Sequence, residues 1–403
     1  MVKRFDVIVV GGGIGGSTLA GVLARAGLEV LVAEKAPRFR DVVRGEGTLP
    51  WGVAEARRLG VASLFEQAGG TDLVGLRLYD EPTVSKTHHW VSESGERLHE
   101  ACFSHPRLQE TAFTWAGAQG ATACRPMKVT GYVNDGTPTV TVDRDGGVES
   151  FRARLIVGAD GKRSTVRRWT GGDGAEDPEH HRFGGVAVSG VRTEDLDTDN
   201  VAGPPGTGVN WFAQSAGTHR LYLMMTHERL REHDIDRSFD ALVAFAAGYM
   251  PEGSLDDVHQ EGPIGFFPNS DTWATRIAGS DVVLIGDAAG SPDPTQGHGT
   301  ALVFRDVREL SDLLIERQDW PAAIDEFAER RTRYFDVIHE YDRWQNILGM
   351  ETGEQADRLR GTNKLAEEAD PTLGGFGVLD ALGPDGLVAD AEARARYFGS
   401  DVR

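Results

Sequence analysis

The chain has 403 residues, 40% of them hydrophobic and 26% charged, which describes a globular protein with enough apolar residues for a sizeable core. Its formal net charge of −20 disfavours nucleic acid and anionic membrane surfaces as partners, because both attract basic faces. Two cysteines without metal-ligand spacing, Cys102 and Cys124, fit a reducing cytoplasm, and no apolar run approaches the roughly 18 residues of a membrane helix.

A βαβ unit opens the chain. Residues 5–10 form a β-branched run that predicts a strand, and residues 17–26 predict a helix that ends at Gly27. Residues 28–35 predict a second strand. This order of elements is typical of a parallel α/β sheet.

The loop between the first strand and the helix contains G-x-G-x-x-G at Gly11, Gly13 and Gly16. Gly11 allows a tight turn, Gly13 lets a pyrophosphate approach the backbone, and Gly16 lets the helix pack on the strand. The helix N-terminus adds free N–H groups and a partial positive charge. We therefore expect a dinucleotide here, with Ile14 and Gly15 also in contact with it.

Glu34 ends the second predicted strand, and Lys35 follows it. A carboxylate at this place accepts hydrogen bonds from both ribose hydroxyls of an adenosine and repels a 2′-phosphate. The pattern predicts FAD or NAD rather than NADP, with Glu34 and Lys35 among the contacts.

The later elements are predicted from apolar periodicity and from glycine turns. We expect helices at 51–59, 109–119, 238–248, 300–315 and 388–398, short strands across 71–101, strands around 139–157, strand-like segments in 186–275, and a polar boundary loop at 171–185. From residue 300 to about 365 the chain is predicted to be mostly helical.

The stretch GDAAGSPDPTQGHG, residues 286–299, lies between an apolar run at 282–285 and the predicted helix at 300–315. A flexible linker would not be framed by two such regular elements. The glycines predict instead a loop that brings backbone close to a large polar ligand.

Three motifs in this order resemble flavoprotein monooxygenases of the para-hydroxybenzoate hydroxylase type. They are the glycine loop with Glu34, the DG motif at Asp160 and Gly161, and the GD motif at Gly286 and Asp287, and together they span about residues 5–310. The resemblance implies an α/β fold, with a Rossmann-like FAD-binding lobe interleaved with a β-rich substrate lobe and followed by a helical C-terminal region. The expected FAD lobe covers 1–75, 101–172 and 276–335, the substrate lobe 76–100 and 173–275, and the helical region 336–403.

The resemblance also implies non-covalent FAD in an extended pose, with the flavin at the second loop. Asp287 is then placed to accept from a ribityl hydroxyl, and Pro294, Gly297, His298 and Gly299 form a backbone cradle for the ring. The N–H groups that begin the following helix stabilise negative charge on the reduced flavin. We assign catalytic roles to the backbone of Pro294, Gly297 and Gly299, and the proton-handling residue is not visible.

Three arginines are further candidates. Arg44 in VRGEG resembles a family residue that contacts the FAD pyrophosphate, against the alternative of a surface arginine. Arg107 in SHPRLQ is assigned to FAD by the same resemblance, together with Gln109. Arg167 ends the DG motif, and either a cofactor contact or an ion pair with Asp160 would explain it.

The second loop departs from the family pattern at four positions. Gly290 replaces a usual His, Asp293 precedes Pro294 where two prolines are common, and His298 and Ala301 replace frequent Gln and Asn. We expect FAD binding to survive these changes and the substrate side to differ.

The function implied is a monooxygenase that uses NAD(P)H and O2, forms a flavin C4a-hydroperoxide, and oxygenates an aromatic or conjugated small molecule. Asp306 matches the acidic residue of the monooxygenase helix. GDAAG also occurs in geranylgeranyl-reductase-type flavoproteins, and halogenases share the lobe, although their W-x-W-x-I-P motif is missing. A flavin-binding protein without turnover is the third alternative.

The expected electron donor and metal content are inferred from motifs that the sequence lacks. A second Rossmann unit is missing, so either NAD(P)H binds transiently in a groove or a separate flavin reductase delivers electrons. The histidines His88, His89, His99 and His105 lack ligand spacing, and no metal is expected. The assembly is predicted to be a monomer or homodimer.

Overall fold

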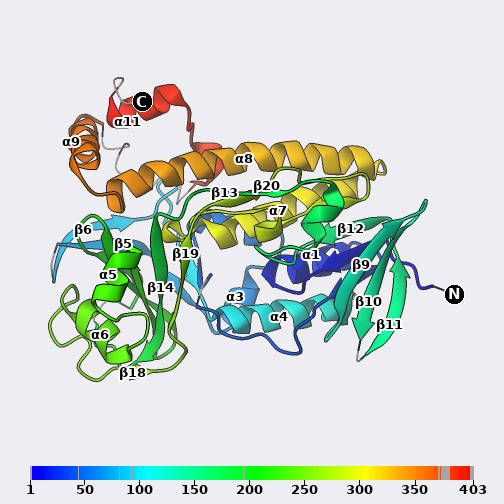
Figure 1. The fold of residues 1–403 in the computed structure, drawn as a ribbon, viewed down its shortest axis with the longest axis horizontal. Helices are drawn as coiled ribbons and strands as arrows, with labels where there is room; N and C mark the ends of the chain where they lie inside the picture. The colour runs from blue at the N-terminus through cyan, green and yellow to red at the C-terminus, as the bar shows by residue number, and fades with distance from the viewer. Residues whose placement is uncertain are drawn as a thin grey trace.

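The computed structural model of the protein describes residues 2–43, 45–80, 82–92, 94–144, 146–193, 196–370, 373 and 382–399. Two sheet-based lobes lie side by side beneath the long helix α8 (Trp320–Gly349), which runs across the top of Figure 1. The helices α9 (Glu354–Ala369) and α11 (Ala391–Phe398) pack against each other near the C-terminus.

The first lobe is built on a parallel five-stranded sheet. Its strand order is β21 (Val282–Leu284), β12 (Leu155–Gly158), β1 (Val7–Val10), β2 (Val30–Ala33) and β8 (Thr122–Cys124). Every residue of β1, β2 and β12 is buried, as in parallel sheets covered on both faces. The helix α1 (Ile14–Arg25) packs against α4 (His105–Ala118) and α7 (His298–Glu316).

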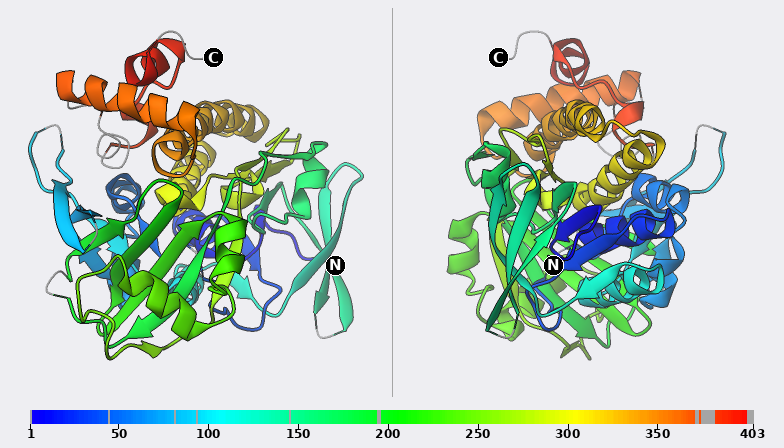
Figure 2. Two further views of the ribbon diagram at one scale, coloured as in Figure 1. Left: turned by 60° about the vertical axis from the view of Figure 1, so that its left-hand side comes forward. Right: turned by 90° about the vertical axis from the view of Figure 1, so that its right-hand side faces the viewer.

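The second lobe is a larger sheet of eight strands. Its order is β18 (His259–Gln260), β14 (His181–Ser189), β17 (Thr218–Met225), β16 (Thr207–Ser215), β15 (Thr198–Ala202), β5 (Gly75–Asp80) and β6 (Thr83–His89), with β19 (Gly265–Asn269) also paired to β14. The helices α5 (His227–Glu232) and α6 (Phe239–Ala247) lie over its outer face (Figures 1 and 2).

Side chains of this sheet alternate between two environments because successive residues of a strand point to opposite faces. On β16, Val209 and Trp211 pack with Leu242 of α6 in the outer core. Phe212 packs on the other face with Tyr222 and other apolar residues. That inner face is the one the site uses.

The remaining elements complete the two lobes. Three small sheets are formed by β9 (Lys128–Asn134), β10 (Pro138–Arg144) and β11 (Gly147–Arg152); by β3 (Gly47–Thr48), β4 (Thr71–Leu73) and β7 (Glu100–Cys102); and by β13 (Gly174–Glu176), β20 (Thr272–Ala274) and β22 (Gly290–Ser291). The described residues also form the helices α2 (Pro50–Arg58) and α3 (Ser63–Gln67), with 3-10 turns at Val166–Thr170, Gly286–Ala288, Pro294–Gln296 and Pro384–Gly386.

The predicted boundary loop at 171–185 is wrong. The structure places β13 there and begins β14 at His181. Polar residues and glycines are typical of a turn, but Gly185 is glycine for a packing reason: an added Cβ would lie 1.9 Å from the carbonyl oxygen of Leu221 on the paired strand. The predicted starts of three helices also shift: α4 begins at His105, α7 at His298, and α11 at Ala391, where the Asp390 side chain accepts from the N–H of Ala393.

Candidate flavin and substrate site

The sequence motifs meet at one edge of the parallel sheet. Gly11 follows β1, Glu34 follows β2, Asp160 lies just after β12, and Gly286 lies just after β21. Carboxyl ends of parallel strands share an edge, and ligands of such sheets bind there. All four residues line one cavity of 1070 Å³, which continues to the inner face of the larger sheet.

The glycine loop is shaped by close backbone approaches. Gly11 has a φ of +107°, and an added Cβ would lie 2.3 Å from the carbonyl oxygen of Ala159. A Cβ on Gly16 would lie 2.0 Å from the carbonyl oxygen of Gly11. A Cβ on Gly13 would meet only Gln109 within 4 Å, at 3.6 Å, so this glycine keeps the loop open on the cavity side. Ile14 and Gly15 also line the cavity.

Glu34 is fixed by the backbone around it. Its two carboxylate oxygens accept from the N–H of Gly12 at 2.8 Å and from the N–H of Ala36 at 2.7 Å. Each oxygen keeps further acceptor capacity. Glu34 and Lys35 line the cavity, where the carboxylate can receive the hydroxyls of a ribose.

The DG motif and the GD motif are tied together by Arg167. Asp160 accepts from the hydroxyl of Ser164 at 2.5 Å and from the N–H of Thr165 at 2.7 Å, which holds the turn that carries Gly161 along the cavity. Arg167 donates to the carbonyl oxygens of Ala288 at 3.0 Å and Asp287 at 3.2 Å. Among the described contacts, Arg167 therefore supports the backbone of the GD motif, and its ion pair with Asp160 is not formed.

The side chain of Asp306 on α7 holds the loop that carries the GD motif. This fully buried carboxylate accepts from the N–H of Gly286 at 2.7 Å and from the hydroxyl of Tyr334 at 2.5 Å. Arg331 lies 3.5 Å away. Burial raises the pKa of Asp306, while Arg331 opposes that rise. The acidic residue noted in the sequence thus holds the backbone of the GD motif in place.

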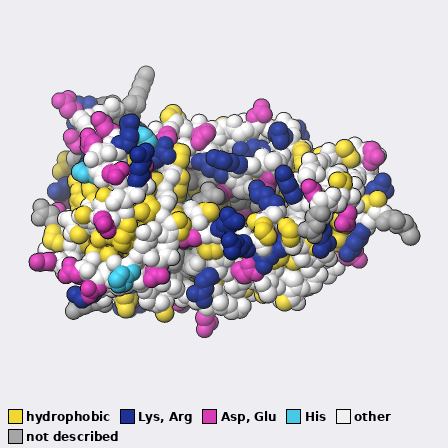
Figure 3. Space-filling model, turned by 60° about the horizontal axis from the view of Figure 1, so that its bottom comes forward, with side chains coloured by type: hydrophobic (Ala, Val, Ile, Leu, Met, Phe, Trp, Pro, Cys, Tyr) yellow, Lys and Arg dark blue, Asp and Glu magenta, His cyan; other side chains and the backbone are white. Residues whose placement is uncertain are grey.

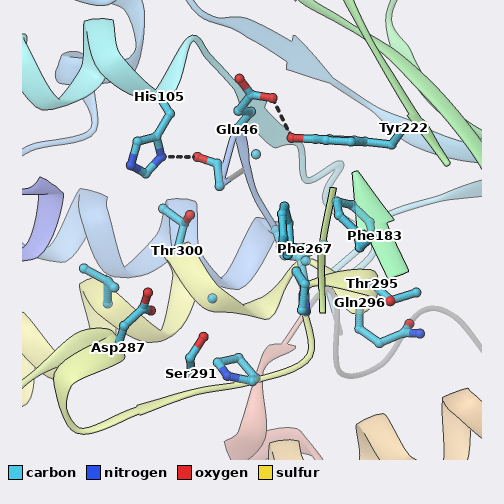
Figure 4. Close-up of a pocket in the computed structure, with 18 of the residues that line it drawn as sticks. Glu46, His105, Phe183, Tyr222, Phe267, Asp287, Ser291, Thr295, Gln296 and Thr300 are labelled. Atoms are coloured by element: carbon cyan, nitrogen blue, oxygen red, sulfur yellow. Dashed lines mark hydrogen bonds between the residues drawn. The ribbon is translucent and has the colours of Figure 1, made fainter. Parts of the chain in front are cut away.

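The start of α7 forms the proposed flavin cradle. Gly297 has a φ of +74°, which favours glycine, and it joins the turn Pro294–Gln296 to α7. Gly299 lines the cavity, and an added Cβ there would meet no atom of any residue that the structure describes within 4 Å. The first N–H groups of a helix have no partner inside the helix. Figure 4 shows Thr300, Asp287 and Ser291 around this helix start.

Three predicted cofactor residues contribute no described side chain to the cavity. The His298 imidazole is fully buried, 3.4 Å from a carboxylate oxygen of Asp342, and burial lowers its pKa to about 3. His298 is absent from the cavity lining. The Arg107 guanidinium lies beside Gly69 and is also absent from the lining. Arg44 falls outside the described residues.

The far wall of the cavity is aromatic, and sequence reasoning left it unassigned. Phe183, Tyr222 and Phe267 face the helix start across the cavity in Figure 4. The Tyr222 hydroxyl donates to buried Glu46 at 2.5 Å, and the guanidinium of Arg220 also donates to it. Burial raises the pKa of Glu46, and Arg220 opposes the rise. Glu46 belongs to the VRGEG segment, whose arginine alone had been chosen from the sequence.

Asp293, which departs from the family pattern, is held by a cluster of polar side chains. Asn269 donates to one oxygen of this buried carboxylate at 2.5 Å, and Asn346 donates to the other at 2.9 Å. His181 lies 2.7 Å from the hydroxyl of Thr295, a cavity residue, and burial lowers the pKa of His181 to about 4. The cluster therefore fixes the loop that carries Pro294.

Two groups of potential metal ligands occur among the described residues. They are His180, His181 and Asp293, and Asp177, Asp271 and His339, with ligand atoms within 4.8 Å in each group. None of these belongs to the histidines considered in the sequence. The expectation of no metal stays a prediction.

The residues of the cavity fit FAD. The glycine loop and the start of α7 give two backbone sites for anionic or electron-rich groups, separated along one elongated cavity, and Glu34 stands at the ribose position of the first. A single βαβ loop would serve only the adenosine half. The fold and the site together define an FAD-binding α/β protein.

Comparison with known proteins identifies the family of this chain. Residues 4–335 match the family described as FAD binding domain. The chain therefore belongs to this family of FAD-dependent monooxygenases of the para-hydroxybenzoate hydroxylase type, as the sequence motifs predicted. The match covers both glycine motifs and the strands of both sheets.

The relatives include oxygenating and reducing enzymes. The rifampicin monooxygenase of Streptomyces venezuelae is 29% identical over 371 residues, which cover 88% of this chain and 74% of that protein. A digeranylgeranylglycerophospholipid reductase of Methanothrix thermoacetophila is 31% identical over 310 residues, covering 73% and 74%. The solved p-nitrophenol 4-monooxygenase PnpA of Pseudomonas putida DLL-E4 has a TM-score of 0.76 at 18% identity, covering 92% and 95%.

Within the described residues, no helix combines the length and apolar character needed to cross a membrane.

Proposed function

We propose that this protein transfers one oxygen atom of O2 to an aromatic or conjugated small molecule. The observation that carries the proposal is the continuity of the cavity. One space joins the backbone cradle at Gly297 and Gly299 to the aromatic wall of Phe183, Tyr222 and Phe267. A planar substrate stacked on that wall would lie opposite the flavin edge.

FAD, when bound, would supply the reduction of O2 and the transfer of oxygen. The chain's own residues bind and orient. The first N–H groups of α7 would stabilise negative charge near Gly299, and Asp287 lines the same part of the cavity to receive a ribityl hydroxyl. The apolar inner face would exclude water from the reacting atoms.

NAD(P)H is the proposed reductant, either bound transiently or used by a separate flavin reductase. Lys and Arg side chains gather on the face shown in Figure 3, although the net charge is −20. Such a face suits the phosphates of a dinucleotide. We also propose the lobe division 1–75, 101–172 and 276–335 for FAD, 76–100 and 173–275 for substrate, and 336–403 for the helical region, in a monomer or homodimer.

An FAD-dependent reductase is the second candidate. It is favoured by the 31% identity to a digeranylgeranylglycerophospholipid reductase and by Gly290, which gives the loop the sequence GDAAG. Such an enzyme would deliver hydride to a double bond and would need no O2.

Oxygen consumption separates the two candidates. We expect the FAD-loaded protein, given NADH or NADPH (with a flavin reductase if neither alone reduces it), to consume O2 faster when an accepted substrate is present. The same mixture without O2 is expected to leave the substrate unchanged. Anaerobic loss of a substrate double bond would show a reductase instead.

A further inference from the structure

One carboxylate on the substrate wall has no role in the account so far. Asp199 lies on β15, a central strand of the larger sheet, and lines the cavity. Its strand alternates: Asp199 and Val201 line the cavity, whereas Asn200 is buried and absent from the lining, and Ala202 also packs in the outer core. Two of its neighbours are apolar: Leu76 is its partner on β5, and Phe212 belongs to the inner core with Leu76.

The carboxylate is held at one oxygen only. The side-chain amide of Asn210 donates to Oδ1 at 2.5 Å, and the N–H of Asn200 donates to the same oxygen at 2.8 Å. Both hydrogen bonds that the described residues make to this carboxylate therefore end on Oδ1. The second oxygen, Oδ2, accepts no hydrogen bond from a described residue and is therefore available to a ligand in the cavity that Asp199 lines.

We propose that Asp199 is the residue that accepts a proton from a hydroxyl group on the conjugated ring of the substrate. The inference rests on the proposed function, because it assumes that the substrate occupies this wall. It assigns the proton-handling role that the sequence did not reveal, and it requires the substrate to carry an ionisable hydroxyl.

The step is a simple proton transfer. The O–H bond of the substrate breaks, its electron pair stays on the substrate oxygen, and the proton moves to Oδ2 of Asp199. The oxyanion then donates electron density into the ring, which makes the ring a better nucleophile toward the transferred oxygen. Asn210 orients the carboxylate and remains bound to Oδ1 throughout.

The protonation behaviour of Asp199 fits this role. Burial raises its pKa from 3.8 to about 7, although the hydrogen bonds from Asn210 and Asn200 act in the opposite direction. Above about pH 7 the group is a carboxylate that accepts a proton, and below it the group is a neutral acid. A base whose pKa lies near the working pH is the efficient choice.

Several charged or titratable groups surround this part of the wall. The pKa of the Cys102 thiol on β7 is raised by burial and by the charges of Glu100, Asp199 and Glu46, which places these carboxylates near one another. The guanidinium of Arg220 forms an ion pair with the carboxylate of Glu46. The groups that face this region are Glu100 and Cys102 of β7, Glu46 before β3, Arg220 and Tyr222 of β17, and His88 of β6.

The test is calorimetric binding of 1-naphthol and of its methyl ether to the FAD-loaded protein, between about pH 5.5 and 8.5. A hydrogen bond to a charged acceptor strengthens binding, so the wild-type affinity for 1-naphthol is expected to rise about tenfold as pH passes 7. The methyl ether lacks the O–H and is expected to show no such rise.

Two variants distinguish proton acceptance by Asp199 from a general effect of removing one negative charge from the protein. Asp199→Asn is expected to bind 1-naphthol about tenfold more weakly at high pH and to lose the pH dependence. Asp197→Asn removes the same charge from an exposed residue two positions earlier and is expected to behave like wild type.

Any of three results overturns the proposal: no binding of 1-naphthol to the wild-type protein, a wild-type affinity for 1-naphthol that does not rise as pH passes 7, or an unchanged preference for 1-naphthol over its ether in Asp199→Asn. The wild-type pH profile decides the matter even if a variant fails to fold. Because binding needs no turnover, failure here is distinct from failure of the oxygen-consumption test.

Discussion

Gly299→Ala tests the flavin cradle with little disturbance of the fold. An added Cβ at this position would meet no atom of the described residues within 4 Å, and the residue lies in the first turn of α7. Alanine is a better helix residue than glycine, so the substitution is expected to keep or raise the stability of the FAD-free protein, by up to about 1 kcal/mol. The described part of the chain therefore gives no steric reason for glycine here.

The bound flavin gives such a reason. If the ring lies against the backbone of Gly299, a methyl group forces it away, and overpacking of this kind costs about 1–3 kcal/mol. FAD affinity is then expected to fall by roughly 5- to 150-fold. Fluorescence titration with FAD measures the affinity, and urea unfolding of the FAD-free protein measures stability.

Gly361→Ala is the matched control. Gly361 lies in the helix α9, is exposed, and also has no atom of a described residue within 4 Å of an added Cβ, but it does not line the cavity. The control is expected to gain similar stability without any change in FAD affinity. Unchanged FAD affinity in Gly299→Ala would refute the cradle, and a loss of stability without FAD would show that the glycine serves the fold.

Three further predictions concern the cofactor and the buried carboxylates. Acid precipitation is expected to leave FAD in the supernatant, and a yellow pellet would contradict non-covalent binding. Glu34→Ala is expected to weaken FAD binding by about 1–3 kcal/mol, because charge-assisted hydrogen bonds are lost and the N–H of Gly12 loses its acceptor; equilibrium dialysis that shows no change would remove Glu34 from the ribose site. Asp199→Asn is expected to raise the free energy of unfolding more at about pH 8 than at about pH 5. Folding raises the pKa of Asp199 to about 7, so the ionised carboxylate destabilises the folded protein increasingly as pH rises through that value, and Asn removes this cost. Equal effects in urea unfolding at the two pH values would contradict that raised pKa.

The nucleotide-binding end of the fold was predictable because its signals are local. A strand, a glycine loop and a helix follow one another within residues 5–26, and the carboxyl ends of parallel strands must share an edge. The positions of Gly11, Glu34, Asp160 and Gly286 at one edge therefore follow from the sequence once the strands are found.

The direction in which each side chain at the start of α7 points was harder to predict than the presence of the helix. The sequence predicted a helix that starts at Thr300, whereas α7 begins at His298, and this helix turns the His298 imidazole into the core near Asp342 and leaves Gly299 on the cavity. A shift of one residue in a helix changes direction by about 100°, and a motif without a known helix start does not fix it.

The substrate wall depends on strand register, which no local pattern fixes. Asp199, Asn210 and Tyr222 come from three strands, and they share a face only because Val201 pairs with Asn210 and Asn210 pairs with Tyr222. A register slip of one residue would turn each of these side chains to the other face. The sequence shows an ordinary polar residue at each position, so the wall was left unassigned.

The central claim is that this protein places an oxygen atom from O2 on its substrate. The most direct measurement is mass spectrometry of the products formed from 1-naphthol and related hydroxyarenes under isotopically labelled O2, with FAD, NAD(P)H and a flavin reductase present. The account predicts a product that carries one labelled oxygen atom, with the second atom of O2 released as water. A product formed without label, or a reduced substrate that appears equally well without O2, would contradict it.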